Sequence, residues 1–284
     1  MILLDGKKLS FEIDTKIKER VIQLKKRNII PGIGIILVGD NLESKKYISM
    51  KEKKCKELGM HFSLIHLKED ITEDDILSSI NTMNGDTYIH GIIVQLPLPK
   101  QFNPSVILNK VSYEKDVDGF HKINAGELYQ NINPSFVPCT PLGCIELLNY
   151  YNIDVKGLDI VIIGASKIVG LPLALLLLQK EATVTICHIE TKDIIQHTKN
   201  ADIVISCCGV PNLVKKHWIK DDVIIIDIGI TVVDGKIIGD VDFEDVKDKV
   251  KYITPVPGGV GPMTVSMLMY QTVTACEKLI NLKL

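Results

Sequence analysis

Apolar stretches of strand length alternate along the chain with segments of helical period. The stretches comprise residues 32–39, 61–67 and 91–99 in the first half and residues 159–164, 182–187, 202–209 and 222–230 in the second. Continuous apolar runs of this length, separated by helical segments, are typical of parallel strands whose faces are covered by helices. The pattern therefore predicts an α/β protein built on mostly parallel sheets.

A long irregular stretch separates the two series. Residues 113–141 are rich in Asn, Pro, Gly and Asp and show no regular period, and such a stretch within a compact protein usually serves function or links domains. A chain of 284 residues has the length of two moderate α/β domains. We therefore expect a first domain over residues 1–139, a second over residues 140–261 and a final helix over residues 262–284.

Composition argues against several classes of partner. The net charge of −2 and the charged fraction of 24% provide no electrostatic attraction to nucleic acid or anionic lipid. The N-terminal segment lacks the pattern of a signal peptide, and no apolar run approaches the roughly 18 residues of a membrane span, so we expect a cytoplasmic protein without a membrane partner. The seven cysteines contain no C-x-x-C pair and the seven histidines no H-E-x-x-H pair, so we expect no metal site.

The segment DIVIIGASKIVGLPLALLLL, from Asp159 to Leu178, predicts a buried strand, a glycine turn and a helix. This order is typical of a dinucleotide-binding unit, in which free amides at the start of the helix bind phosphate. Gly164 and Gly170 stand six residues apart and do not form G-x-G-x-x-G. By itself the motif is equally compatible with a tight turn in an α/β protein that binds no nucleotide.

A second candidate site lies in residues 44–60. At about 100° per residue, one stripe of a helix would contain Tyr47, Ile48, Lys51, Cys55 and Leu58. A lysine within an apolar stripe loses hydration, which lowers its pKa and makes the neutral amine accessible for proton transfer. We expect Tyr47, one turn earlier, to hydrogen-bond the amine and fix its direction. The alternative is a lysine whose alkyl chain crosses the apolar face so that its ammonium reaches water.

Tyr47 and Lys51 also match the Y-x-x-x-K pattern of the short-chain dehydrogenases. In that family the glycine-rich turn precedes the Tyr-Lys pair, whereas here Tyr47 precedes Gly164 by more than a hundred residues. The order of the motifs therefore excludes that family.

Further motifs extend over nearly the whole chain. Gln95 ends an apolar strand, the position at which α/β sheets hold their ligands, and Asp116 and Asp118 lie in the irregular stretch. Other motifs are YISMK (47–51), PCTP (138–141), GASKIVGLP (164–172), GDVDF (239–243) and PVPGGVGPMT (255–264). Together these segments resemble the bifunctional 5,10-methylenetetrahydrofolate dehydrogenase and 5,10-methenyltetrahydrofolate cyclohydrolase family, often called FolD. The resemblance runs in unbroken order from about Leu4 to Leu279.

The resemblance implies an N-terminal folate-binding catalytic domain, a Rossmann-like dinucleotide-binding domain, a C-terminal helix that returns to the first domain, and a homodimer. In the family, the lysine matching Lys51 serves the cyclohydrolase step, the tyrosine matching Tyr47 stacks near the folate and orients that lysine, and the glutamine matching Gln95 tunes it. Asp118 matches the carboxylate that binds the pterin. The loop beside the folate corresponds to Pro257, Gly258, Gly259 and Val260. The positions that match the dinucleotide site are Thr140, Gly164, Ala165, Ser166, Ile168, Val169, Gly170, His188, Ile189, Glu190, Cys208, Gly209 and Ile230.

The function implied by the resemblance is oxidation of 5,10-methylenetetrahydrofolate to 5,10-methenyltetrahydrofolate with NAD(P)+, followed by hydrolysis to 10-formyltetrahydrofolate, a one-carbon donor for purine biosynthesis. Hydride transfer between two planar reactants requires alignment and no metal, and a neutral amine at Lys51 suits the attack of water on the methenyl cation. Two alternatives are a monofunctional NAD-dependent dehydrogenase and a non-catalytic folate or nucleotide-binding relative, both of which would most readily lose the lysine. A hydroxyacid or shikimate-type dehydrogenase would share only the second domain and would leave residues 255–264 unexplained.

The chain departs from the family pattern at the nucleotide site. The family turn is G-R-S, whose arginine helps to hold the 2′-phosphate of NADP, and its second strand ends in C-H-S-[KR]-T. Here Ala165 replaces the arginine, and the strand ends in Cys187-His188-Ile189-Glu190-Thr191. An acidic residue at this place accepts the ribose 2′-hydroxyl of NAD and repels a 2′-phosphate. We therefore expect a preference for NAD over NADP without a need for magnesium or phosphate; the alternative is a solvated Glu190, with Lys192 serving the phosphate.

Overall fold

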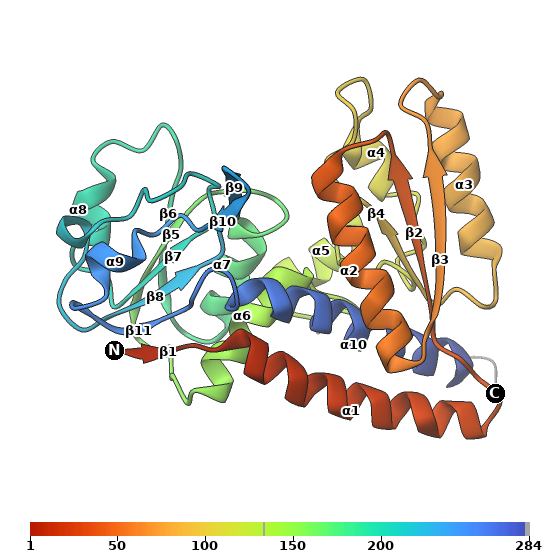
Figure 1. The fold of residues 1–284 in the computed structure, drawn as a ribbon, viewed down its shortest axis with the longest axis horizontal. Helices are drawn as coiled ribbons and strands as arrows, with labels where there is room; N and C mark the ends of the chain where they lie inside the picture. The colour runs from red at the N-terminus through yellow and green to blue at the C-terminus, as the bar shows by residue number, and fades with distance from the viewer. Residues whose placement is uncertain (133, 282–284) are drawn as a thin grey trace. The chain divides into compact units, whose positions relative to one another are not determined.

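The computed structural model describes residues 1–132 and 134–281. The chain forms two compact units, one of Met1–Phe11 with Thr140–Thr264 and one of Glu12–Cys139 with Val265–Leu284. We name them the six-stranded unit and the three-stranded unit after their main sheets. Both are α/β, as the alternation of apolar and helical segments predicts (Figure 1).

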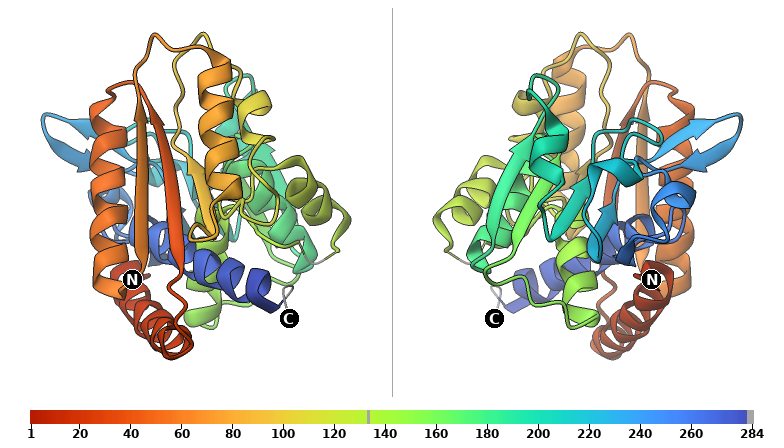
Figure 2. Two further views of the ribbon diagram at one scale, coloured as in Figure 1. Left: turned by 90° about the vertical axis from the view of Figure 1, so that its right-hand side faces the viewer. Right: turned by 90° about the vertical axis from the view of Figure 1, so that its left-hand side faces the viewer.

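The sheet of the three-stranded unit is parallel throughout, in the order β3 (His61–Leu67), β2 (Gly32–Val38) and β4 (Gly91–Val94). All residues of the central strand β2 are buried, which explains its unbroken apolar sequence. Helices α2 (Leu42–Leu58) and α3 (Glu73–Gly85) connect the strands and flank the sheet (Figures 1 and 2). Sequence predicts both connections because the period changes from strand to helix at these places.

Two long helices complete this unit, α1 (Gly6–Lys26) from Glu12 onward and α10 (Val260–Asn281) from Val265 onward. Arg20 on α1 donates to both carboxylate oxygens of Glu277 on α10, at 3.1 and 2.7 Å. Ser266 Oγ donates to Asp14 Oδ1 at 2.7 Å. The C-terminal helix thus packs with the first half of the chain, which confirms the return that the resemblance implies.

The irregular stretch of residues 113–141 contains more helix than its composition predicts. It includes α5 (Lys122–Gln130) and the start of α6 (Cys139–Tyr150). Asn124 on α5 is fully buried and donates to Asp116 Oδ2 at 2.8 Å and to the Tyr113 carbonyl at 3.1 Å. These bonds to the preceding segment stabilise a short helix for which the sequence has no clear period.

The sheet of the six-stranded unit is also parallel throughout. Its order is β1 (Ile2–Leu3), β11 (Val250–Ile253), β8 (Val223–Asp227), β7 (Ile203–Ser206), β5 (Asp159–Ile163) and β6 (Thr183–Cys187). The helical elements of this unit are α6, α7 (Gly170–Gln179), α8 (Ile194–Thr198), η1 (Lys216–Trp218) and α9 (Phe243–Val246). A separate antiparallel hairpin of β9 (Thr231–Val233) and β10 (Lys236–Ile238) projects from the unit (Figure 2).

Residues 1–11 cluster with the six-stranded unit, whereas the sequence pattern assigned them to the first domain. β1 adds to the sheet edge beside β11, and the Leu4 amide donates to the Ile253 carbonyl at 2.8 Å. The Asp5 amide donates to the Tyr151 hydroxyl at 2.8 Å. A strand of only two residues has no recognisable period, so pairing across the chain decides where this segment belongs.

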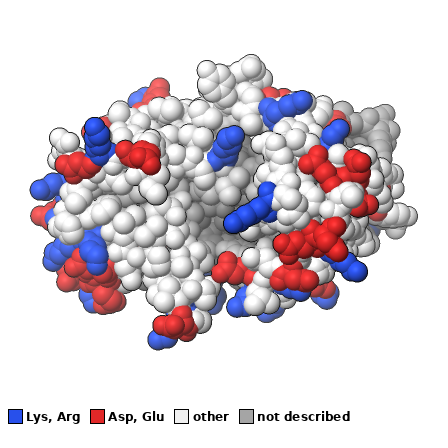
Figure 3. All heavy atoms as spheres, turned by 90° about the horizontal axis from the view of Figure 1, so that it is seen from above, with Lys and Arg blue, Asp and Glu red and all other residues white. Residues whose placement is uncertain are grey.

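None of the helices in residues 1–132 and 134–281 combines the length and the apolar character needed to cross a membrane. On the face shown in Figure 3, acidic and basic side chains are interspersed.

Candidate functional site

Lys51 lies on the buried face of α2. The buried residues of this helix are Ser44, Ile48, Lys51, Cys55 and Leu58, while Tyr47 is half-buried. Asn41 caps the start of the helix through a bond from the Ser44 amide, and Gly59 ends it in the left-handed conformation. The side chain of Lys51 is part of this buried face and Lys51 is only 8% exposed, so the helical period places the amine as predicted.

Gln95 holds the amine of Lys51. Lys51 Nζ donates to Gln95 Oε1 at 2.9 Å, and Gln95 Nε2 donates to the Leu96 carbonyl at 2.7 Å. The backbone of Gln95 continues the sheet beyond β4 because its amide donates to the Ile36 carbonyl at 2.9 Å. The sequence predicted Tyr47 as the partner of the amine; within the part of the chain that the structure describes, Gln95 takes that place.

Burial and a nearby carboxylate act in opposite directions on Lys51. Burial lowers the pKa of Lys51, and the charge of Asp118 raises it. Burial also raises the pKa of Asp118, while the Lys51 ammonium lowers it. Tyr47 is affected as well, because burial raises the pKa of its phenol. Lys51 and Asp118 act on each other in a poorly hydrated environment, in which a lysine can lose its proton more readily than in water.

The residues before Asp118 fix its segment of the chain. Lys115 Nζ donates to the carbonyls of Asn84 and Asp86, each at 2.8 Å, at the C-terminal end of α3. Asp116 Oδ2 accepts from the His121 amide at 2.7 Å and from Asn124 Nδ2 at 2.8 Å. Burial raises the pKa of Asp116 to about 7.

A glutamine of the C-terminal helix binds the same region from another side. Gln271 Nε2 donates to the carbonyls of Val117 and Val137, at 2.7 and 2.9 Å, and Gln271 Oε1 accepts from the Val137 amide at 3.0 Å. Cys139 Sγ donates to the Val117 carbonyl at 3.2 Å. The arrangement brings together a buried amine, an amide and a carboxylate. It suits proton transfer beside a ligand whose N–H groups donate hydrogen bonds to the carboxylate.

In the glycine turn of the six-stranded unit, the backbone segments around Gly164, Gly170 and Cys207 approach one another more closely than the sequence indicates. A Cβ on Gly170 would lie 2.0 Å from the Gly164 carbonyl oxygen, and a Cβ on Gly164 would lie 2.7 Å from the Cys207 carbonyl oxygen. Gly164 also has a positive φ of 123°. Glycine is therefore required at both places, and the spacing of six residues is set by this contact.

The first amides of α7 are not free, contrary to the expectation of an open phosphate site. Ser166 Oγ accepts from the amide of Val169 at 3.2 Å and from that of Gly170 at 3.5 Å, and the Ser166 carbonyl accepts from Leu171 at 3.0 Å. Pro172, the next residue, has no amide hydrogen. The serine of the turn thus occupies donors that a helix start usually presents to an anion. Ala165 and Ile168 lie in the same turn.

A second short turn follows β6. The His188 amide donates to Thr191 Oγ1 at 2.8 Å, and the Glu190 amide donates to His188 Nδ1 at 3.2 Å. His188, Ile189 and Glu190 are all exposed, Ile189 to 95%. β5 and β6 are neighbours, and their last residues, Ile163 and Cys187, are paired. The turns that contain Ala165 and Glu190 therefore lie at the same edge of the sheet.

Asp240 organises the loop after β7. Its carboxylate accepts from the Cys208 and Val210 amides, each at 2.8 Å, and from Ser206 Oγ at 2.9 Å. The Gly209 amide also reaches it, at 3.3 Å. The GDVDF motif by itself does not reveal the role of Asp240, because Asp240 lies 30 to 34 residues along the chain from the groups that it binds.

The remaining predicted site residues also belong to the six-stranded unit. The Thr140 and Thr264 hydroxyls are 2.9 Å apart, and Ile230 is 40% exposed in the segment after β8. Pro257, Gly258 and Gly259 form a loop, but Val260 already begins α10, whereas the sequence placed it in the loop. Lys51, Tyr47, Gln95 and Asp118 lie in the three-stranded unit.

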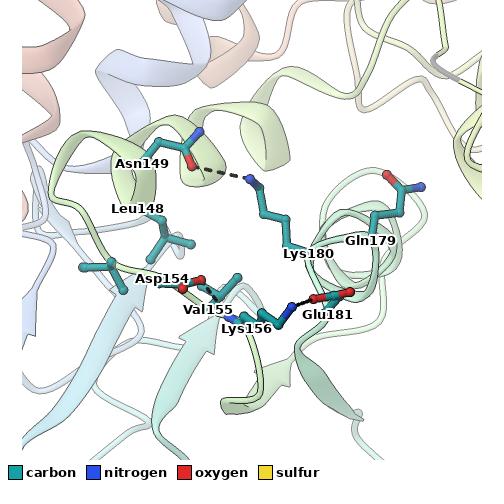
Figure 4. Close-up of a pocket in the computed structure, with 9 residues that line it drawn as sticks. Leu148, Asn149, Asp154, Val155, Lys156, Gln179, Lys180 and Glu181 are labelled. Carbon is teal, nitrogen blue, oxygen red and sulfur yellow. Dashed lines mark hydrogen bonds and ion pairs between the residues drawn. The ribbon is translucent and has the colours of Figure 1, made fainter.

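A pocket of about 300 Å³ in the six-stranded unit lies away from these loops (Figure 4). Its walls are the end of α6, the segment that leads into β5, and the end of α7. An ion pair between Lys156 and Glu181 and a 3.5 Å contact between Lys180 Nζ and Asn149 Oδ1 cross it (Figure 4). It lies at the amino edge of a parallel sheet, and ligands of such sheets bind at the carboxyl edge. We therefore do not assign the nucleotide to it.

Several residues of the site were not found from the sequence. Gln271 and Lys115 have no role that the sequence indicates, and Cys139 lies in the PCTP motif without one; each acts through a partner distant in the chain. The sequence marks these residues only as polar side chains within segments that are otherwise apolar or that contain a motif.

Comparison with known proteins agrees with this geometry. The family model of the tetrahydrofolate dehydrogenase/cyclohydrolase catalytic domain matches residues 4–118, and that of the NAD(P)-binding domain matches residues 138–280. The bifunctional protein FolD of Nautilia profundicola is 50% identical over 278 residues, which cover 98% of each chain.

Two solved structures are similar over nearly their whole length. The bifunctional FolD enzyme of Campylobacter jejuni has a TM-score of 0.96 and 49% identity, covering 98% of this chain and 99% of that one. The FolD of Trypanosoma brucei, complexed with NADP cofactor and inhibitor, has a TM-score of 0.95 and 34% identity, covering 99% and 98%. The chain belongs to the tetrahydrofolate dehydrogenase/cyclohydrolase family.

Proposed function

We propose that this chain oxidises 5,10-methylenetetrahydrofolate with NAD(P)+ and hydrolyses the resulting 5,10-methenyltetrahydrofolate to 10-formyltetrahydrofolate. The observation that carries both activities, rather than the dehydrogenase alone, is the buried amine of Lys51 bound to Gln95 at 2.9 Å. Hydride transfer requires only that the folate and the nicotinamide be aligned. Ring opening also needs a group that accepts and returns protons, and a lysine of lowered pKa beside a cationic intermediate can do this.

The folate is bound through Asp118, and Tyr47 supplies an aromatic surface. A carboxylate accepts a pair of charge-assisted hydrogen bonds from the amino group and the ring N–H of a pterin. A carboxylate has two acceptor oxygens, so Asp118 retains this capacity beside the hydrogen bond that it accepts from the Cys139 thiol. The same carboxylate acts electrostatically on Lys51, so folate binding and proton transfer are coupled.

The nucleotide preferred by this chain is NAD. Ala165 and Glu190 lie at one edge of the sheet, after the paired ends of β5 and β6. Alanine offers no charge to a 2′-phosphate, and an exposed glutamate repels one while accepting a ribose hydroxyl. The preference holds without magnesium or inorganic phosphate.

The test is a set of paired assays on one preparation, which follow methenyltetrahydrofolate with NAD, with NADP and with neither nucleotide. kcat/KM is then measured for both nucleotides, with and without magnesium and phosphate, in the wild type and in Ala165→Arg/Glu190→Lys. We expect the wild type to favour NAD and the double variant to shift toward NADP by about tenfold or more. A wild type that favours NADP, or a double variant without a shift, contradicts the assignment.

We further propose a cytoplasmic homodimer that supplies one-carbon units for purine biosynthesis. β3 is an edge strand of its sheet in the described part of the chain, and Leu64 on it is 43% exposed. An exposed edge strand is a template for pairing with a second copy. The seven free cysteines suit a reducing compartment. Light scattering of the wild type and of Leu64→Lys tests the dimer, since the charge at this edge should produce a monomer.

A further inference from the structure

Gln271 is a buried polar side chain with no role in binding or chemistry. It lies on α10, and only 5% of its surface is exposed. Its side-chain amide makes two hydrogen bonds to the backbone of Val137: Oε1 accepts from the Val137 amide at 3.0 Å, and Nε2 donates to the Val137 carbonyl at 2.9 Å. Nε2 also donates to the Val117 carbonyl at 2.7 Å and lies 3.3 Å from Cys139 Sγ. One side chain therefore binds two chain segments.

The two segments are otherwise held together by direct contact of their backbones. A Cβ on Gly119 would lie 2.6 Å from the carbonyl carbon of Val137 and 2.7 Å from the nitrogen of Pro138. Gly119 has a φ of 70°, which favours glycine. Cys139 Sγ adds a bond to the Val117 carbonyl at 3.2 Å. The residues between these contacts, including Asp118, have little freedom to move while the amide of Gln271 is in place.

The segments fixed in this way include the carboxylate of Asp118, whose charge acts on Lys51. Asp118, Cys139 and Cys55 are the titratable groups that act on the amine, and Gln95 is its hydrogen-bond partner. Asp118 and Cys139 belong to the two segments that Gln271 joins, whereas Cys55 and Gln95 are held by α2 and by the sheet. A shift of the joined segments would change the position of Asp118 relative to the amine.

We propose that Gln271 is a positioning residue of the folate site, which holds Asp118 and Cys139 in place relative to Lys51. The inference rests on the proposed function for the roles of Asp118 and Lys51. Gln271 lies 154 residues along the chain from Val117, so it takes part in folate recognition only through the segments that it holds.

The experiment compares Gln271→Leu, which has a similar size but no amide, with Thr272→Val. Thr272 is the adjacent residue on α10, is fully buried, and donates only to the Leu268 carbonyl of its own helix among the described residues. It therefore reports the effect of losing a buried hydrogen bond on α10. The measurements are KM for folate and for nucleotide, the pH profile of cyclohydrolase kcat, and thermal unfolding.

We expect Gln271→Leu to raise the folate KM by about tenfold, to change the nucleotide KM by less than about twofold, and to move the acid limb of the cyclohydrolase profile to lower pH. The acid limb moves because Asp118 no longer stabilises the Lys51 ammonium as strongly. Thr272→Val should keep the wild-type KM values and pH profile. Equal behaviour of the two variants, at temperatures where both are folded, overturns the proposal.

Gln271→Asn decides the question if the leucine variant does not fold. It keeps the amide but is shorter by one methylene, so it should show the same changes to a smaller extent; a wild-type folate KM and pH profile would refute the role. Calorimetric titration with tetrahydrofolate separates this outcome from failure of the proposed function. If the wild type shows no turnover, the proposed function fails. The positioning role is then tested by binding alone, since Gln271→Asn should bind tetrahydrofolate more weakly than the wild type does.

Discussion

Lys51 has an unusual environment for a lysine, because its amine is buried and bound to an amide rather than to a carboxylate. We predict that Lys51→Met abolishes the cyclohydrolase, with a loss of about a hundredfold or more, and leaves appreciable dehydrogenase activity, since only ring opening needs the amine. Lys53→Met is the control, because Lys53 lies on the same helix with 80% of its side chain exposed. Equal loss of both activities in a folded Lys51→Met protein would contradict this division.

Asp118 acts on Lys51 and is the residue that we propose to bind the pterin. Its charge raises the pKa of Lys51 against the effect of burial, so Asp118→Asn should lower that pKa further. The acid limb of the kcat profile of the cyclohydrolase, measured at saturating folate, should then move to lower pH. The folate KM should rise about tenfold with the loss of a charge-assisted bond. An unchanged folate KM would place the pterin elsewhere.

At the scale of elements, one carboxylate holds a whole loop of the proposed nucleotide site. Asp240 accepts from Ser206 and from three successive amides in residues 208–210. We predict that Asp240→Asn raises the nucleotide KM about tenfold and leaves the folate KM unchanged. The NH2 group of asparagine cannot accept hydrogen bonds, so some of the loop's donors would lose their acceptor. The assay is the dehydrogenase with either reactant varied.

Asp242 provides the control for this loop. It stands two residues further in the same motif, but it caps α9 and pairs with Lys215 at 3.2 Å. Asp242→Asn should therefore lower stability slightly without affecting the nucleotide KM. If Asp240→Asn is folded and behaves as Asp242→Asn does, the loop does not depend on Asp240.

At the scale of the molecule, two buried carboxyls make stability depend on pH. Burial raises the pKa of Asp116 and of Asp227 to about 7, from an ordinary value of 3.8. Between these values the folded chain keeps protons that the unfolded chain releases. Each group therefore lowers the free energy of unfolding as pH rises from about 4 to about 7, by roughly 1.4 kcal/mol per pH unit.

Asp227→Asn tests this dependence. Urea unfolding at pH 4.5, 5.5 and 6.5 should show a smaller decrease in stability for the variant than for the wild type, because one of the titrating groups is gone. Asp234→Asn, at an exposed position in the β9–β10 turn, should keep the wild-type slope. A variant slope equal to that of the wild type would mean that Asp227 does not bind its proton in this range.

The sequence by itself determined the features that depend on local period. The alternation of apolar runs gave the strands, the stripe on α2 buried Lys51, and the end of an apolar strand placed Gln95 at the edge of the sheet. Each follows from a few neighbouring residues, because the direction of a side chain is fixed by the geometry of its own helix or strand. The order of the motifs along the chain also sufficed for the family.

Only the tertiary structure decided which side chains hold the site together. Gln95 rather than Tyr47 binds Lys51, Ser166 takes up the first amides of α7, and Gln271 joins segments more than 130 residues away. The same holds for β1, which is defined by its pairing with β11. A single hydrogen bond between distant segments leaves no periodic trace in the sequence, since any polar residue at that position looks the same until the fold brings its partner within reach.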